Sequence, residues 1–302
     1  MKKGIGVIAS LLTSILGLTG CCFCFSPGRG DISSRIIRDI NAGPVVSVDR
    51  SVDLGDAEQV DITIQFAGGD LEIGGDGDDL DDGLMIGEFL YNLDELEPEI
   101  EYEVAQERGT LRVRNLKQEI RLDRWTKEIR NEWKIVLTKK VPLELTIDTG
   151  ASRGELALGG LQITDLELNV GAADIKVSFD DLNPQEMSEL RVHSGAARLE
   201  LADLGNANLS KLLFDGGIGS YTFDLRGEWQ RSAQVEIKSG VSNIVIYIPR
   251  DVGVRLCPGG LKEGDYGKLT EKEGCYVNDL FQDAETTLDI KLDVGLSDVN
   301  VK

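Results

Sequence analysis

Ser194-Gly195-Ala196-Ala197-Arg198-Leu199 is one copy of a pattern that recurs through the second half of this chain. The pattern is an alternating apolar run, a glycine, any residue, a small residue and another alternating apolar run. Other copies are Thr149-Gly150-Ala151-Ser152 and residues 170–175, 216–221 and 239–244, so that the first glycines fall at 150, 171, 195, 217 and 240. A further copy occupies residues 294–299, and an imperfect one residues 67–71. Such a short, nearly constant spacing between the glycines is typical of repeat proteins whose units bury their apolar faces against their neighbours.

The apolar residues around each glycine alternate with a period of two, as in Leu143, Leu145 and Ile147. Period two predicts strands and not helices. We expect glycine at a corner between two strands because it adopts backbone angles closed to other residues. The predicted fold is therefore all-β, a β-solenoid-like stack of two-strand repeats. The alternative, an antiparallel β-sandwich, is less favoured because a sandwich does not require the corner motif to recur in phase.

The composition is acidic, with 53 Asp and Glu residues against 32 Lys and Arg residues in 302, a formal net charge of −21. A surface of this sign argues against binding of DNA, RNA or anionic lipid through a basic face. It is typical of a solvated exterior that keeps an extended sheet soluble.

The first residues resemble a bacterial lipoprotein signal peptide. Lys2 and Lys3 precede an apolar run at residues 5–18, and Leu18-Thr19-Gly20-Cys21 matches a lipobox. We expect residues 1–20 to be removed, Cys21 to carry fatty acids such as palmitate, and residues 21–50 to form a tether. The alternative is an uncleaved membrane helix, because the apolar run continues to residue 25. Either anchor places the body of the chain outside the cytoplasm, at the membrane.

The rest of the chain divides into two predicted regions. Residues 51–142 form an amino-terminal β region with a hairpin insertion, whose arms are residues 100–104 and 111–113. Residues 143–302 form the repeat domain, with an insertion at about 257–284. Cys257 and Cys275 flank this insertion and are candidates for a disulfide, although spacing alone does not show whether they face each other. The acidic run at 76–82 fails the helix–loop–helix calcium template and is interpreted as a solvated turn.

The chain offers few residues for catalysis. The single histidine, His193, adjoins Ser194 on a predicted strand, where neighbouring side chains point to opposite faces and cannot form a relay. We therefore predict no catalytic residues, metal site or cofactor. The first functional hypothesis is a non-catalytic interaction or scaffold module that contacts an envelope protein or wall polymer. The alternative is a protein that binds or processes envelope glycans, motivated by the many acids and by Trp125, Trp133 and Trp229.

These features together resemble the bacterial "toast-rack" envelope family. The resemblance is carried by residues 51–57 and 67–73, Arg130-Asn131-Glu132-Trp133, Val141-Pro142-Leu143, the Gly-x-small repeats and residues 248–254. The chain is more distantly similar to the carboxy-terminal domain of cell-wall-active-antibiotic response proteins and to adhesin-type repeat domains. The resemblance implies an all-β body of stacked strands on a membrane or lipid anchor, whereas a role in adhesion or envelope stress sensing belongs to the first functional hypothesis. It implies no catalytic activity and no cofactor.

Overall fold

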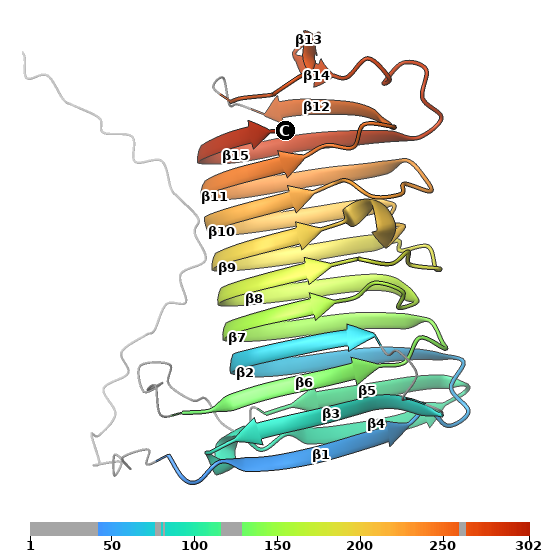
Figure 1. Cartoon of the computed structure of the whole chain (residues 1–302), viewed down its shortest axis with the longest axis vertical. Helices are drawn as coiled ribbons and strands as arrows, with labels where there is room; N and C mark the ends of the chain where they lie inside the picture. Colours follow the sequence, from blue (N-terminus) through green and yellow to red (C-terminus); the bar gives the residue numbers. More distant parts are fainter. Residues whose placement is uncertain (1–41, 76–79, 81, 116–128, 260–263) are drawn as a thin grey trace, which may run out of the picture. The chain divides into compact units, whose positions relative to one another are not determined.

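In a computed structural model, residues 42–75, 80, 82–115, 129–259 and 264–302 are described. They belong to one compact unit, Asn41–Lys302. Nearly all of the regular structure is β, in one open sheet of 15 strands (Figure 1). The predicted all-β stack is confirmed, and the main strands pair in parallel and not as in an antiparallel sandwich.

Each repeat is built from one long strand that bends at its corner glycine. We call the residues before the corner the first arm and those after it the second arm. Both arms pair in parallel with the arms of the neighbouring strands, so the strands stack as coils (Figure 1). The bent strands are β2 (Gln59–Gly75), β7 (Leu143–Ala157), β8 (Ile163–Ser178), β9 (Glu189–Ala202), β10 (Lys211–Asp224), β11 (Ala233–Tyr247) and β15 (Thr287–Val301).

The structure of the corner explains why glycine recurs. The reason is not the unusual backbone angles that were expected from the sequence. None of the six corner glycines has a φ in the left-handed region. A Cβ on any of them would instead lie 2.2–3.0 Å from the carbonyl oxygen of the corner residue in the preceding coil. Glycine is needed because stacked corners approach too closely for a side chain. The ladder begins at Ala67, which stands opposite Gly150.

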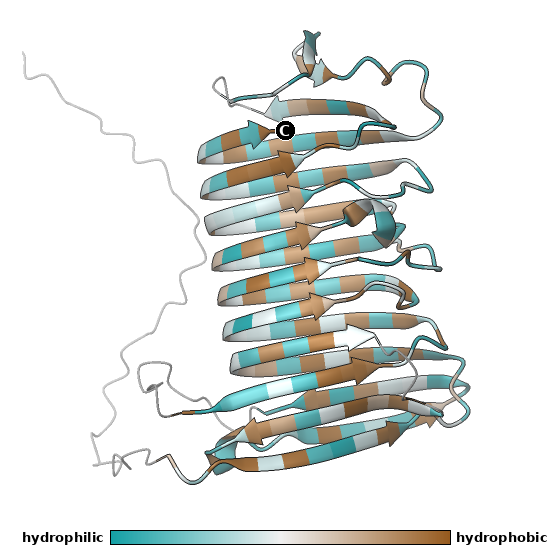
Figure 2. Cartoon of the chain, in the orientation of Figure 1, coloured by the Kyte–Doolittle hydropathy of each residue, from teal (hydrophilic) through white to brown (hydrophobic). Residues whose placement is uncertain are grey.

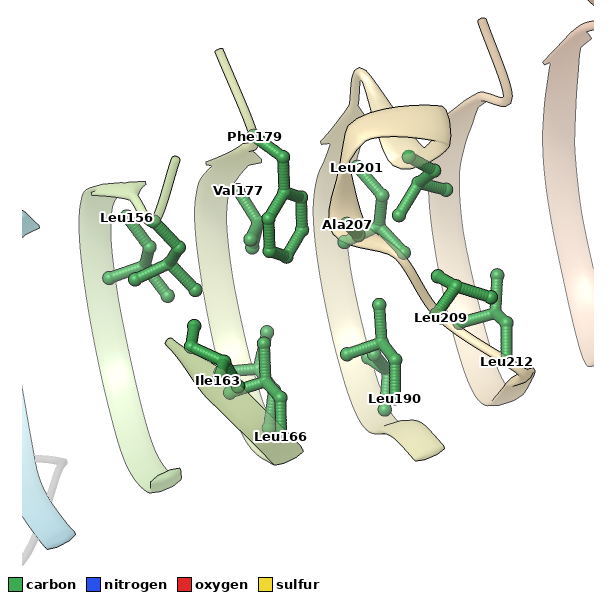
Figure 3. Packing of buried hydrophobic residues seen from close by; sticks show 14 of the residues in the cluster. Leu156, Ile163, Leu166, Val177, Phe179, Leu190, Leu201, Ala207, Leu209 and Leu212 are labelled. Atoms are coloured by element: carbon green, nitrogen blue, oxygen red, sulfur yellow. The ribbon is translucent and has the colours of Figure 1, made fainter. Parts of the chain in front are cut away.

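The hydrophobic core lies between the two arms. In β7 the inward residues are Leu143, Leu145 and Ile147 before the corner and Leu156 after it, so the corner shifts the alternation by one residue. The alternation of apolar and polar residues along each arm is visible in Figure 2. Return segments between coils close the core with their own buried residues, such as Phe179 and Ala207 (Figure 3). The short 3-10 helix η3 (Leu204–Ala207) lies in one of these segments.

At the amino-terminal end of the stack the two arms of β2 have different partners. The first arm pairs with β5 (Arg108–Arg114), which forms a hairpin with β4 (Glu99–Ala105). The second arm pairs with β6 (Asn131–Leu137), followed outward by β3 (Gly83–Tyr91) and β1 (Val46–Asp53). A 3-10 turn, η1 (Asp94–Leu96), connects the two sides. This hairpin lies where the insertion was predicted, and it extends one arm of the sheet.

At the other end the strands do not follow sequence order. The first arm of β15 lies between β11 and β12 (Gly253–Gly259), although β12 precedes it in the chain. Two short strands, β13 (Thr270–Lys272) and β14 (Cys275–Val277), complete this end. They lie within the predicted insertion at 257–284.

The structure also bears on the segment boundaries. β1 begins at Val46, inside the range 21–50 expected to be a tether. Residues 1–41 and most of the acidic run at 76–82 lie outside the described residues, as does Trp125.

Candidate interaction surface

The outer side of the corner carries an exposed row of side chains. The residue after each corner glycine points away from the core, and it is alanine in β7, β8 and β9. In the last three coils it is Ile218, Val241 and Leu296, whose exposed fractions are 63%, 47% and 81%. Ile218 stands opposite Val241, and Val241 opposite Leu296. We call these three residues the apolar ridge.

Polar residues border the ridge on both sides. On the first-arm side the nearest outward row contains Asp215, Lys238 and Asp293, which stack in register. On the second-arm side the corresponding row is Ser220, Asn243 and Asp298. Contiguous exposed apolar residues with a polar rim are characteristic of interaction sites, whereas single exposed apolar residues are ordinary.

Hydroxyl groups fill the narrow inner side of the corner beneath the ridge. Ser239 Oγ donates to Ser242 Oγ at 2.8 Å, and the hydroxyls of Ser242 and Ser297 lie 2.9 Å apart. The first bond lies within β11, and the second links the coils of Val241 and Leu296. These two coils are therefore joined by a side-chain hydrogen bond as well as by the parallel ladder.

The first-arm face carries a row of four stacked carboxylates from Asp61, Glu144, Asp165 and Glu189. Cations border the row: Arg108 binds Asp61 (Nε–Oδ2 2.6 Å) and Glu144 (Nη2–Oε2 3.0 Å), and Lys211 lies 3.2 Å from Glu189. Burial, and then the charges of Glu144 and Glu189, raise the pKa of Asp165. Within the described ranges no group of three or more His, Cys, Asp or Glu side chains is arranged to hold a metal ion.

The second-arm face shows a different electrostatic pattern, in which opposite charges alternate from coil to coil. Asp70, Arg153, Asp174 and Arg198 stand in register across β2, β7, β8 and β9. Arg153 binds Asp70 at 2.8 Å, and Arg198 lies 3.9 Å from Asp174. Exposed pairs of this kind contribute only about 0–1 kcal/mol each. They keep the face charged without providing a reactive group.

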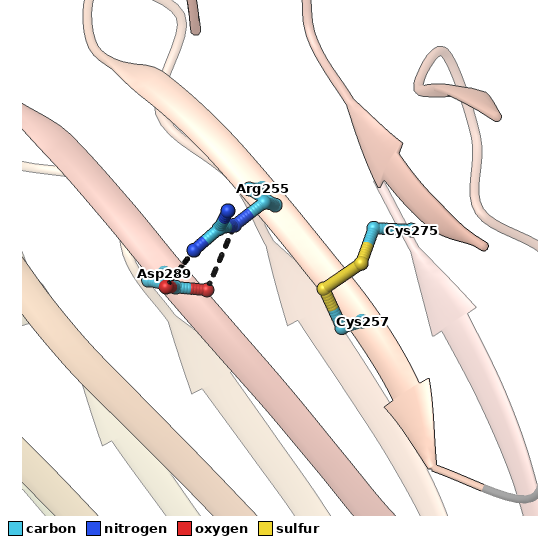
Figure 4. Close-up of a disulfide and its surroundings, with 4 residues drawn as sticks. All are labelled: Arg255, Cys257, Cys275 and Asp289. Atoms are coloured by element: carbon cyan, nitrogen blue, oxygen red, sulfur yellow. Dashed lines mark hydrogen bonds and ion pairs between the residues drawn. A yellow bond between two sulfur atoms is a disulfide. The ribbon is translucent and has the colours of Figure 1, made fainter. Parts of the chain in front are cut away.

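A hollow of 460 Å³ lies at the carboxy-terminal end, lined by β12, β13 and β14. Arg255 and Lys272 are the basic residues that line it. Arg255 binds Asp289 through Nε and Nη2 and also lies 5.3 Å from the centre of the Phe281 ring. Cys257 and Cys275 form a disulfide beside this hollow, joining β12 to β14 (Figure 4). Arg255 is thus already paired with Asp289.

The other residues singled out from the sequence do not converge. His193 is exposed on β9, whereas Ser194 is buried on the opposite face, so the two form no relay. Trp133 is 1% exposed and packs between Phe66 and Phe89, with ring centres 5.0 and 5.2 Å away. Trp229 is also buried and donates its indole N–H to Leu225 O at 2.7 Å. Neither indole offers an exposed face to a glycan. Cys21 lies outside the described residues.

The ridge was not predicted from the sequence. The signal was the "any residue" position of the repeat, which changes from alanine to Ile, Val and Leu in the last three coils. Strand alternation cannot show where that side chain points, because the corner shifts the alternation by one residue.

The fold and surface define an all-β, solenoid-like protein of stacked parallel coils. The chain belongs to the toast-rack family: the family described as the N-terminal domain of toast_rack, DUF2154, matches residues 41–188 and again residues 181–247. The family resemblance inferred from the sequence is confirmed.

Several solved structures are similar over most of this chain. A proposed cell adhesion protein from Clostridium sporogenes is 23% identical with a TM-score of 0.46, over 86% of this chain and 99% of its own. A proposed adhesin from Bacteroides fragilis is 11% identical, with a TM-score of 0.34, 86% of this chain and 97% of its own covered. A proposed lipid binding protein from Parabacteroides distasonis is 10% identical, with the same TM-score and coverage.

A comparison with curated proteins finds no match. In the part of the chain that the structure describes, no helix is long and apolar enough to cross a membrane.

Proposed function

We propose that this chain is a non-catalytic interaction module of the bacterial envelope. Lipid on Cys21 holds it at the extracytoplasmic side of a membrane, and the apolar ridge contacts an envelope protein or wall polymer in adhesion or stress sensing. The observation that carries the proposal is the exposure of Ile218, Val241 and Leu296 in one continuous row.

The ridge is suited to a contact of moderate strength. Complete burial of one Val, Leu or Ile side chain contributes about 1.5–3 kcal/mol. Part of this gain is offset by the loss of translational and rotational freedom on association. An anchor raises the effective concentration of module and partner on the same surface, so a weak contact can persist. Ridge and anchor therefore support one another in this function.

Photo-crosslinking in living cells tests the ridge. A photoreactive amino acid at position 296 should give a discrete adduct, and Ile218→Ser together with Val241→Ser should remove it. The matched control is the same amino acid at position 182, because Leu182 is an exposed apolar residue outside the ridge. Equal adducts at 182 and 296, or an adduct at 296 that survives the double substitution, would contradict the assignment of the ridge.

The anchor has a separate test. Cys21→Ser should abolish metabolic labelling with a fatty acid and leave the precursor uncleaved, because the thiol is the site of acylation. Cys24→Ser is the matched control and should retain processing. Persistent labelling and normal cleavage of the Cys21→Ser chain would refute the lipobox interpretation and leave the membrane-helix alternative.

A further inference from the structure

The amino-terminal end of the sheet has two edge strands that lie at different heights. Three strands, β6, β3 and β1, continue the second arm of β2, whereas only β5 and β4 continue the first arm. β4 therefore ends one strand short of β1, which is the lowest strand in Figure 1. Among the described residues, β4 pairs with β5 alone, and no other backbone hydrogen bond reaches its outer edge.

The hairpin geometry shows which backbone groups of β4 face outward. Ala105 and Arg108 close a two-residue turn in which Gln106 and Glu107 have φ of 52° and 64°. In such a hairpin the closing pair is hydrogen-bonded, and every second pair after it is also bonded. Ile100, Tyr102 and Val104 fall between the bonded pairs. Their N–H and C=O groups consequently point to the outer edge.

The two faces of β4 differ in character. Ile100 and Tyr102 pack against the core, and Val104, on the same face, is 39% exposed. Tyr102 donates its hydroxyl to Leu54 O at 2.7 Å, in the loop that follows β1. The opposite face of β4 carries Glu99, Glu101 and Glu103. Arg114 on β5 binds Glu99 at 3.0 Å and Glu101 at 2.9 Å, and among the described residues Glu103 has no ion pair. A strand added to this edge would meet apolar side chains on one face and carboxylates on the other.

We propose that the outer edge of β4 accepts an extended segment of a partner protein, alternately apolar and basic, as an additional strand. The backbone of β4 supplies hydrogen bonds, the apolar face covers Val104, and the basic residues face Glu103 and Glu101, whose ion-pair partner within the chain is Arg114. This surface is separate from the apolar ridge. Strand addition of this kind combines backbone affinity with recognition of alternate side chains.

Charge disfavours a second copy of this chain as the occupant. Two β4 strands related by a two-fold axis would pair antiparallel, with residues of the same face opposite each other. The outward row is glutamate at 99, 101 and 103, so overlap in such a register places glutamate against glutamate. Like charges directly opposite each other destabilise a strand pair.

Peptide binding to the full chain tests the proposal. The probe is a fluorescein-labelled nine-residue peptide of alternating valine and lysine, followed by fluorescence anisotropy. A valine–glutamate peptide should bind at least tenfold more weakly. Amide hydrogen exchange at Ile100, Tyr102 and Val104 should slow when the valine–lysine peptide binds. Unchanged exchange at these three amides would overturn the proposal.

Two controls separate strand addition from general attraction to an acidic protein. Two further peptides carry N-methyl groups on all valines or on all lysines. Only one of the two should lose affinity, at least tenfold, because only every second N–H group of the added strand faces β4. Equal binding of both methylated peptides would overturn the proposal. Glu101→Lys with Glu103→Lys should weaken binding about tenfold. Glu200→Lys with Glu155→Lys, the same charge change on the second-arm face of β9 and β7, should alter it less than twofold.

Sedimentation velocity without peptide decides between a partner and self-pairing. A monomer is expected, and a dimer that disappears in the Glu101→Lys, Glu103→Lys variant would overturn the choice of occupant. Variants of the ridge should still bind the peptide, and the β4 variants should still give the adduct at position 296. Failure of this proposal is thereby distinguishable from failure of the proposed function.

Discussion

At the scale of single residues, the corner glycines are determined by the distance between coils. The carbonyl oxygen of one corner occupies the space that a Cβ in the next coil would need. The sequence showed where glycine recurs, but it could not show whether angle or distance requires it, because both select the same residue. If the short distance between coils is the reason, an alanine in place of a corner glycine must push two coils apart.

Gly150→Ala should destabilise the protein by about 1–3 kcal/mol, the usual cost of overpacking. Its Cβ would lie 2.2 Å from Ala67 O, a backbone atom that cannot move alone. Gly74→Ala in the same strand pair is the control, because its Cβ would lie 3.8 Å from Ala157 O. Urea unfolding measures both. A similar free energy of unfolding for the two variants would contradict the close-approach explanation.

Asp165 provides a prediction on pH. Burial and the charges of Glu144 and Glu189 raise its pKa in the folded state. The ionised carboxylate therefore costs stability above the folded-state pKa, and this cost disappears as the pH falls through that value. Asp165→Asn should raise the free energy of unfolding at pH 7 by about 0.2–1 kcal/mol, with a smaller gain towards pH 3.

Asp215→Asn serves as the control for this measurement. Asp215 occupies the same face, but its register neighbours are His193 and Lys238. It should show no gain at pH 7. A gain from Asp165→Asn that persists undiminished at pH 3 would point to a cause other than ionisation.

At the scale of elements, the repeat and the β4–β5 hairpin were predictable from local sequence, because period-two alternation and turn residues are short-range signals. Two arrangements could not be predicted in this way: the divergence of the two arms beyond β2, and the position of β15 between β11 and β12. Both depend on which distant strands pair. Alternation identifies a strand and its buried face, but it does not specify the neighbour. The ridge was also not predictable from alternation, because the direction of its side chains is set by the backbone at the corner.

The disulfide between β12 and β14 should stabilise one end of the sheet and leave the rest unaffected. β12 also pairs with β15 from Gly253 to Gly259, whereas β13 and β14 have only three residues each. A loop of this size contributes about 3 kcal/mol in the chain-entropy model. Cys257→Ser with Cys275→Ser should therefore speed amide exchange in residues 270–277 by about a hundredfold. Exchange in β7 to β9 should remain within twofold, and equal acceleration there would contradict a local role.

At the scale of the whole molecule, the net charge of −21 opposes the compact state through self-repulsion. Carboxylates on adjacent strands are separated by about 4.8 Å across the ladder. The Debye length falls from about 10 Å at 0.1 M salt to about 3 Å at 1 M. Raising NaCl from about 0.05 to 1 M should therefore raise the thermal midpoint by several degrees. A constant or falling midpoint would show that ion pairs such as Arg108–Asp61 outweigh the repulsion.

The place of β15 in the sheet has a consequence for biosynthesis. Residues 287–301 are made after all the strands that they join, yet they separate β11 from β12. Until β15 is synthesised, β12 has no bent strand to pair with, and one edge of β11 stays unpaired. A premature stop before residue 287 would do more than remove a terminal strand, because β12 and the hairpin of β13 and β14 would lose their connection to the stack. An incomplete chain would therefore present the edge of β11 unpaired.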